Sequence, residues 1–207
     1  MITTEWLMSI GKEHTAEIAA TLDPEGIGQL VGLLAEKNDK IRYPAFLLLQ
    51  ERSYSNSDVY PYWDTFKEKL GSDNSFQRSI GLMMIAVNTR WDKSGRMEET
   101  INDYLERTED EKPITVRQCI QSLSYILPYK PLLGLPIAKK LVSLDLSQVK
   151  DTMRKLILMD IIEILAIIRE SRTTDEIEDY ILSALKGDIL DKKSKKQVEE
   201  LCKVKLF

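Results

Sequence analysis

The chain has 207 residues, of which 43% are hydrophobic and 30% are charged, and its formal net charge is −4. This composition is typical of a globular protein with one substantial core, and the acidic balance argues against a dedicated nucleic-acid binder, which usually has a basic domain. The chain has a single histidine, His14, and two isolated cysteines, Cys119 and Cys202. This inventory excludes a histidine-based triad and a zinc site rich in cysteine or histidine within one chain. We therefore expect no cofactor and no metal.

Helical periodicity dominates the chain, and no run alternates for long enough to predict a strand. A leading helix is expected over residues 4–20. Asp23-Pro24-Glu25 then supplies an N-cap, a first-turn proline and a first-turn acid for a second helix. A break at residues 37–39 leads into a helix over residues 41–52, so these two helices are expected to form a hairpin.

The same two-part unit repeats along the chain, with a shorter amphipathic stretch, a polar break and then a more apolar helix. Four of the more apolar helices have an arginine near the start, and these arginines recur at intervals of 36, 39 and 37 residues. A fixed period of this length is typical of an α-solenoid, in which each helix pair buries its apolar face against its neighbours. The arginines are Arg42, Arg78, Arg117 and Arg154, and the later apolar helices are expected over residues 76–87, 116–127, 149–168 and 189–204.

We therefore expect one all-α domain over residues 1–207, an α–α superhelix of HEAT or armadillo type. About eleven helices are predicted, arranged as one leading helix and five pairs. The register is open at two points. Pro44 lies several residues inside its expected helix, where proline costs about 3 kcal/mol or forces a later start, and Val149-Lys150 competes with Arg154 as the start of the fourth repeat. Thr173 with Glu176 fits a capping box for the helix that follows.

Two segments resemble the second helix of HEAT repeats, which has an aspartate in the turn, an aliphatic residue before a basic one, and apolar residues at helical spacing. They begin at Asp39-x-Ile41-Arg42 and at Val116-Arg117, with weaker copies at Arg78 and Val149-Lys150. The resemblance covers roughly residues 23–205 and departs from the pattern at Gln77, which stands where an aliphatic residue is usual. The stretch 91–119 is also similar to that of small HEAT-like bacterial proteins of unknown activity. The resemblance implies that turn aspartates and helix arginines pair between neighbouring repeats as a ladder.

The leading hypothesis for function is a non-catalytic interaction scaffold that binds a protein or peptide on its concave inner-helix face. Solenoids expose long grooves suited to this role, and few residues here fit a catalytic site, so we lean against an enzyme. The expected centre of partner binding is Arg78, Trp91, Asp92 and Arg117, at the ends of the middle repeats, where aromatic and arginine anchors matter most.

The alternative hypothesis is a HEAT-like DNA glycosylase, because that fold hosts enzymes that use Trp, Asp and Arg on a concave face. The likeness implies a catalytic set of Trp91, Asp92 and Arg117. Such an enzyme needs a strongly cationic groove for the DNA backbone, which the acidic total disfavours. The structural interpretation is that Trp91 packs a helix end and Asp92 caps the next helix.

Charged residues are distributed unevenly. Residues 98–111 hold seven acids and residues 186–205 hold seven lysines. We interpret both stretches first as solvated helix faces, with an anionic-partner patch as the alternative for the lysine-rich end. Asp160 and Glu163 interrupt the most apolar helix, share one of its faces, and could pair with a lysine or arginine of an adjacent repeat.

The location is predicted from three features of the sequence. Residues 1–10 have no long apolar run, so no secretory signal is expected. The most apolar stretch, residues 156–168, is interrupted by two acids and too short to cross a bilayer. The isolated cysteines are typical of a reducing compartment, so we expect a cytoplasmic protein without a membrane partner.

Overall fold

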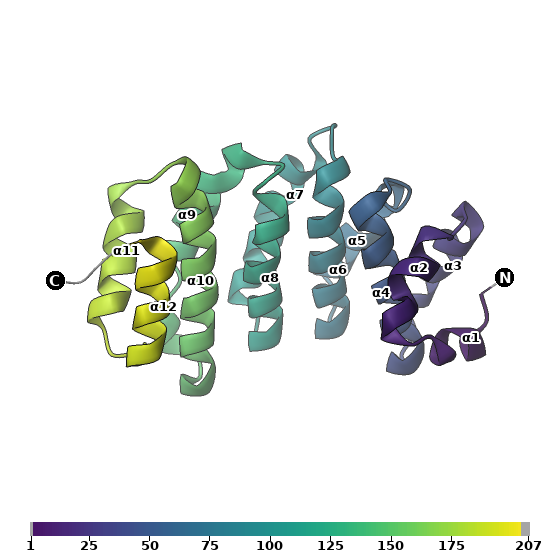
Figure 1. Ribbon diagram of the computed structural model, residues 1–207, viewed down its shortest axis with the longest axis horizontal. Helices are drawn as coiled ribbons and strands as arrows, with labels where there is room; N and C mark the ends of the chain where they lie inside the picture. The colour runs from purple at the N-terminus through teal and green to yellow at the C-terminus, as the bar shows by residue number, and fades with distance from the viewer. Residues whose placement is uncertain (1, 204–207) are drawn as a thin grey trace. The chain divides into compact units, whose positions relative to one another are not determined.

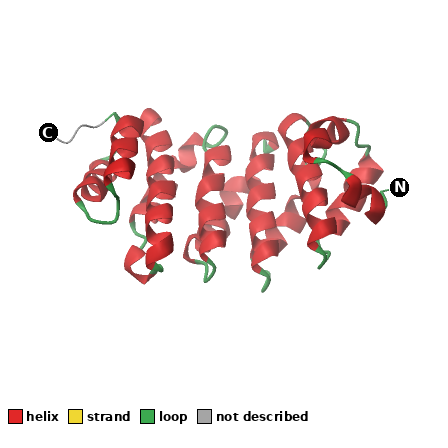
Figure 2. Cartoon of the chain, turned by 60° about the horizontal axis from the view of Figure 1, so that its bottom comes forward, coloured by secondary structure: helices red, strands yellow, loops and turns green. Residues whose placement is uncertain are grey.

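The computed structural model describes residues 2–203, and within that range it contains helices and turns but no strand (Figures 1 and 2). The predicted all-α class is confirmed. The chain divides into two compact units, Met1–Thr100 and Ile101–Phe207, each of which is described by itself. That residues 1–207 form a single domain stays a prediction.

The first unit consists of two helix hairpins that follow a pair of short helices. Helix α3 packs on α4, α5 packs on α6, and the longer helices α4 and α6 pack on each other. Helices α1 and α2 also pack on α4. The bounds are α1 (Thr4–Ser9), η1 (Lys12–His14), α2 (Thr15–Ala20), α3 (Pro24–Leu33), α4 (Asp39–Ser55), η2 (Tyr60–Tyr62), α5 (Trp63–Leu70), α6 (Ser75–Asn88) and η3 (Thr89–Trp91), where η denotes a 3₁₀ helix.

Helix α7 (Arg96–Leu105) carries the chain into the second unit, which is organised around the longest helix, α10 (Asp151–Ser171). Helices α8, α9, α11 and α12 all pack against α10. Figure 1 shows α9 behind α10 and α8 beside it. The other elements are η4 (Glu106–Glu109), α8 (Pro113–Ile126), η5 (Pro131–Leu133), α9 (Gly134–Val142), η6 (Leu146–Gln148), α11 (Asp175–Lys186) and α12 (Lys192–Cys202).

Most of the predicted helices are present, with three corrections. Twelve α-helices lie within residues 2–203, because the leading helix is two helices separated by Gly11, a residue that destabilises helix interiors. Pro44 lies inside α4, which still begins at Asp39. Because proline has no backbone N–H, the carbonyl of Lys40 lacks its usual helical hydrogen bond. Lys40 is exposed, so water can replace that bond. The last expected helix begins at Lys192, three residues later than predicted, and its expected end at residue 204 lies outside the described residues.

The helix starts follow their capping chemistry. The Asp23 carboxylate accepts a hydrogen bond from the Gly26 amide at 2.7 Å, as the sequence predicts. The predicted capping box is wrong by one residue. Thr174, in an extended conformation, is the N-cap of α11 and accepts from the Ile177 amide, whereas the Thr173 hydroxyl donates to Glu178 at 2.7 Å.

The core of each unit comes mainly from the second helix of each hairpin. Buried aliphatic side chains recur on these helices at helical spacing, among them Leu48, Leu49, Met84, Ile85, Ile120, Leu123, Ile161 and Leu165. Within the described residues, no helix is both long and apolar enough to cross a membrane.

Gly81 marks the closest approach of α5 to α6. A Cβ at this position would lie 2.7 Å from the carbonyl oxygen of Phe66 and 3.0 Å from Cβ of Lys69. Backbone atoms cannot move aside cheaply, so a larger residue here would force the two helices apart. The glycine therefore sets the packing distance of this hairpin.

We predict that Gly81→Ala lowers the free energy of unfolding by about 1–3 kcal/mol through overpacking, although alanine is the better helix former. The matched control is Gly32→Ala in α3, where an added Cβ meets no atom within 4 Å, and where the change should stabilise by about 0.5–1 kcal/mol. Urea titrations of both variants measure the difference. An equal effect of the two substitutions would contradict the close approach.

Candidate binding surface on helices α8 and α10

Three of the four recurring arginines donate to the turn that precedes their own helix. Arg42 Nη1 lies 3.0 Å from the carbonyl oxygen of Glu36, and Arg78 Nη1 lies 2.8 Å from that of Ser72. Arg154 Nε lies 2.9 Å from the carbonyl oxygen of Leu146. Each arginine is the fourth residue of its helix, and helical side chains lean toward the N-terminus, so the guanidinium reaches back to the turn. The recurring spacing thus reflects a local clamp on each turn.

The contacts of Arg42 differ from the implied aspartate–arginine ladder between neighbouring repeats. The aspartate beside Arg42 is Asp39 of its own helix, at 2.8 Å, and the next hairpin contributes the ring of Phe76, 5.1 Å from the guanidinium carbon. Gln77, where the HEAT pattern has an aliphatic residue, donates through Nε2 to the Leu34 carbonyl of the preceding hairpin at 2.7 Å. The interface between the two hairpins of the first unit therefore combines a cation–π contact with a side-chain-to-backbone hydrogen bond.

Arg117 makes the predicted type of contact with a neighbouring pair. Its Nε and Nη2 atoms lie 2.6 Å and 3.0 Å from the two carboxylate oxygens of Asp160 on α10, and Gln121 Nε2 donates to the same carboxylate at 2.9 Å. The Asp160 side chain is only 5% exposed. A bidentate, charge-assisted pair of this kind fixes both distance and orientation, so it joins α8 to α10.

Trp91 and Asp92 stabilise helix ends. The Trp91 indole N–H donates to the Ser53 carbonyl at 2.8 Å, in the last turn of α4, and the Arg90 guanidinium donates to the adjacent Tyr54 carbonyl. Asp92 accepts from the backbone N–H groups of Arg96 and Met97 at 3.1 Å and 2.9 Å, at the start of α7. These contacts satisfy backbone groups that helix ends leave without partners, as the structural interpretation of the sequence predicts.

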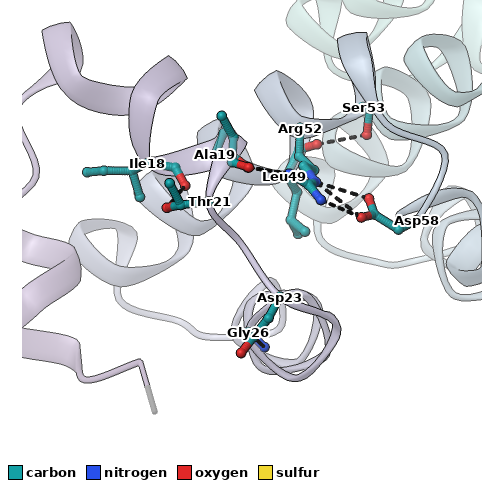
Figure 3. Close-up of polar contacts among 10 residues, drawn as sticks. Ile18, Ala19, Thr21, Asp23, Gly26, Leu49, Arg52, Ser53 and Asp58 are labelled. Atoms are coloured by element: carbon teal, nitrogen blue, oxygen red, sulfur yellow. Dashed lines mark hydrogen bonds and ion pairs between the residues drawn. The ribbon is translucent and has the colours of Figure 1, made fainter.

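Arg52 stabilises the end of α2 in the same way (Figure 3). Its Nη1 atom lies 3.1 Å and 2.7 Å from the carbonyl oxygens of Ala19 and Ala20, the last residues of α2. Asp58 accepts from the other side of the guanidinium, at 2.7 Å. A cation at a helix C-terminus is also favoured by the helix dipole.

The four predicted partner-binding residues are distributed along the chain. Trp91 and Asp92 adjoin each other beyond the end of α6, whereas Arg78 lies in its first turn, about 20 Å away along the axis at 1.5 Å per residue. Arg117 belongs to the second unit. Arg78 and Asp92 are 5% and 7% exposed, so their side chains offer little area to a partner. The binding role of all four stays a prediction.

A solvent-exposed surface follows α8 and α10 in the second unit. The two helices run parallel, because Val116 and Ile157, near their starts, line one cavity, while Leu127 and Ile168, at their other ends, both approach Gly134. We define the α8–α10 face as the Arg117–Asp160 bridge with the side chains around it. The exposed apolar side chains of this face are Ile114 (69%) and Tyr125 (45%) on α8, and Leu156 (39%) and Ile167 (38%) on α10.

Glu163 lies at the centre of the α8–α10 face, one turn beyond Asp160. Burial raises the pKa of Glu163, the neighbouring Asp160 carboxylate raises it further, and Arg117 opposes both effects. No hydrogen-bond or ion-pair partner of Glu163 is found among residues 2–203. The centre of the face therefore holds two carboxylates and one guanidinium, and the guanidinium bonds to Asp160.

A cavity of about 410 Å³ opens between the turn at residues 108–113 and the turn at residues 144–150. Its apolar wall includes Val116 and Ile157, and four acids lie along it. One of these, Glu109, already forms an ion pair with Lys140 at 2.5 Å. The four acids are Glu109, Asp110, Glu111 and Asp145.

Metal and thiol chemistry have little support in the described residues. No group of three or more His, Cys, Asp or Glu side chains within residues 2–203 is arranged to hold a metal ion. Burial raises the pKa of the Cys119 thiol far above its usual range, and its Sγ lies 3.3 Å from the Tyr104 carbonyl oxygen. A thiol that resists ionisation is a poor nucleophile.

No family model matches this sequence, and no curated protein matches it at a significant level. The function is therefore inferred from the side chains and their geometry.

We predict that Arg117→Leu lowers the free energy of unfolding by about 2–3 kcal/mol, because it leaves the buried Asp160 carboxylate with Gln121 as its remaining described partner. The loss is smaller than for a fully buried ion pair, because Arg117 is partly exposed to solvent. The double variant Arg117→Leu/Asp160→Leu should recover part of that loss. Urea titration of the two single variants and the double variant measures the coupling. Strictly additive losses would show that the bridge does not join α8 to α10.

The raised pKa of Glu163 predicts a pH dependence. A carboxyl with a higher pKa in the folded state binds more protons there than in the unfolded chain, so its contribution makes the free energy of unfolding fall as pH rises from about 4.3, the unfolded value, through the folded pKa. Glu163→Gln should remove this contribution and stabilise the chain at neutral pH. Glu170→Gln, at an exposed position on the same helix, is the control. Identical pH profiles for both variants would contradict the assignment.

Proposed function

We propose that the chain is a non-catalytic interaction scaffold that binds a protein or peptide along the α8–α10 face. The observation that carries this proposal is the arrangement of Ile114, Leu156 and Ile167 as exposed apolar side chains around a tightly paired ion bridge. Apolar side chains gathered on the surface of rigid helices are typical of interaction sites. Two packed helices offer such a surface with little loss of conformational freedom on binding.

A HEAT-like α-solenoid is the arrangement that we propose for the hairpins, with the second helices forming the binding layer. Two features support it. The longer helices pack directly on one another in each unit, α4 on α6 and α8 on α10, and the arginine clamp recurs at the same helix position in three hairpins. We also propose a cytoplasmic location, because isolated cysteines are typical of proteins in a reducing compartment.

Among the four residues predicted to bind a partner, Arg117 has the best support. Its side chain is 28% exposed and lies on the α8–α10 face, with its inner edge against Asp160. Arg78, Trp91 and Asp92 are proposed to act indirectly, by holding the ends of α4 and α7 and the turn before α6. Their substitution should therefore alter stability more than partner affinity.

The DNA glycosylase alternative has less support. Asp92, one of its three expected catalytic residues, accepts five described hydrogen bonds. Arg117, another of the three, is bonded to Asp160. Strong, steeply salt-dependent binding of duplex DNA by the purified chain would favour this alternative over the scaffold.

We predict that a photo-crosslinking amino acid at position 114 or 167 captures a partner from a native lysate, whereas the same amino acid at Leu132 does not. Leu132 is 92% exposed but lies on the η5 turn, so it controls for exposure alone. Excess unmodified chain should compete with the capture. Equal capture at position 132 would contradict the proposed binding surface.

For a captured partner, Ile114→Gln and Ile167→Gln should each weaken binding about tenfold, equivalent to about 1.4 kcal/mol. Leu132→Gln should leave it unchanged. All three positions are exposed, so the free energy of unfolding should stay within about 0.5 kcal/mol of the parent. Calorimetric titration with the partner measures the affinities.

A further inference from the structure

The charge at the centre of the α8–α10 face is unbalanced, and this imbalance selects among partners. Asp160 receives two hydrogen bonds from Arg117 and one from Gln121, so the Nε–Nη2 edge of the guanidinium faces that carboxylate. Glu163 adds a second negative charge on the same side of α10 and has no described partner of its own. The centre therefore carries a net charge of about −1 when Glu163 is ionised.

The apolar side chains of α10 lie on either side of this charge. Leu156 precedes Glu163 by seven residues and Ile167 follows it by four, so all three project from one side of the helix. At 1.5 Å per residue they are spaced about 10 Å and about 6 Å along the axis. Ile114, 69% exposed, extends the apolar area onto α8. The pattern along this side of α10 is thus apolar, acidic, apolar, with a further exposed acid, Glu170, three residues beyond Ile167.

Apolar, acidic and cationic partner segments would differ in their free energy of binding to this face. An uncharged apolar segment would remove Glu163 from water without giving it a partner, which is unfavourable for a carboxylate. An acidic segment would face two carboxylates, Asp160 and Glu163, against the single guanidinium of Arg117, whose Nε and Nη2 already bond to Asp160. A cationic side chain would pair with Glu163 and bring the centre to neutrality.

We infer that the α8–α10 face recognises a peptide segment in which a lysine or arginine is flanked by aliphatic residues, with the cation paired to Glu163 and the aliphatic side chains against Leu156 and Ile167. This inference rests on the proposed scaffold function and specifies the chemistry of its partner. Partner selection then depends on one carboxylate that the fold itself does not use.

The test is selection of random 15-residue peptides displayed on phage against the purified full chain. Enriched peptides should contain a lysine or arginine with aliphatic residues within one or two helical turns. Synthetic versions should bind Glu163→Gln at least tenfold more weakly than the parent chain. They should bind Glu176→Gln, an exposed position on α11, with unchanged affinity. Glu163→Lys should instead enrich peptides with an acidic residue at the centre. Unfolding curves of each variant verify that the fold is retained.

The outcomes separate this inference from the scaffold function. Enrichment of uncharged or acidic peptides, or of basic peptides whose affinity is the same for Glu163→Gln, would overturn the inference and leave the scaffold intact. Binding that is unaffected by Ile114→Gln and Ile167→Gln, or a failure to enrich any peptide, would overturn both.

Discussion

Unsatisfied backbone groups at helix ends are the constraint on which this structure depends. Each helix leaves up to four N–H groups and four carbonyls without a partner inside the helix, and a chain built from short helices has many such ends. Side chains meet this demand at starts and at ends. Asn38 and Asn74 accept from first-turn amides of α4 and α6, while Arg52, Trp91 and Arg169 donate to carbonyls at the last residues of α2, α4 and α12. In the turns between helices, backbone carbonyls accept hydrogen bonds from the guanidinium groups of Arg42, Arg78 and Arg154.

This demand explains why polar residues that suggest a functional site can be structural. Trp91 beside Asp92 has the composition of a catalytic or binding pair, yet its indole N–H and carboxylate both bond to helix-end backbone groups. Glu163 presents the opposite case. Burial and the Asp160 carboxylate raise the pKa of Glu163, and no hydrogen-bond or ion-pair partner of Glu163 is described. A residue whose charge is unfavourable in the isolated fold is a better indicator of binding than one whose hydrogen bonds are already made.

The sequence predicts the local part of this structure well. Helix periodicity, the Asp23-Pro24 start and the polar breaks all depend on neighbouring residues, so the helices from α3 onward appear close to their expected bounds. The contacts made between hairpins were harder to predict. Nothing in the pattern distinguishes Arg117, which bonds to Asp160 forty-three residues later, from Arg42, which bonds to Glu36 six residues earlier. The bond from Gln77 to Leu34 appears in the sequence only as a departure from the HEAT pattern. The exposure of Ile114 and Ile167 likewise depends on tertiary packing.

Stability and recognition meet at Asp160. Its pairing with Arg117 joins α8 to α10, and the same pairing directs the Nε and Nη2 atoms of Arg117 at Asp160 and not at Glu163. If Asp160 were uncharged, Arg117 could turn to Glu163 on the same face, and the centre would no longer attract a cation. In the proposed recognition, the buried carboxylate therefore contributes twice, once by fixing the two helices that form the surface and once by keeping the surface selective. Because both contributions arise from one ion pair, substitutions of Asp160 that weaken the contact between α8 and α10 should also broaden the range of partners that the face accepts.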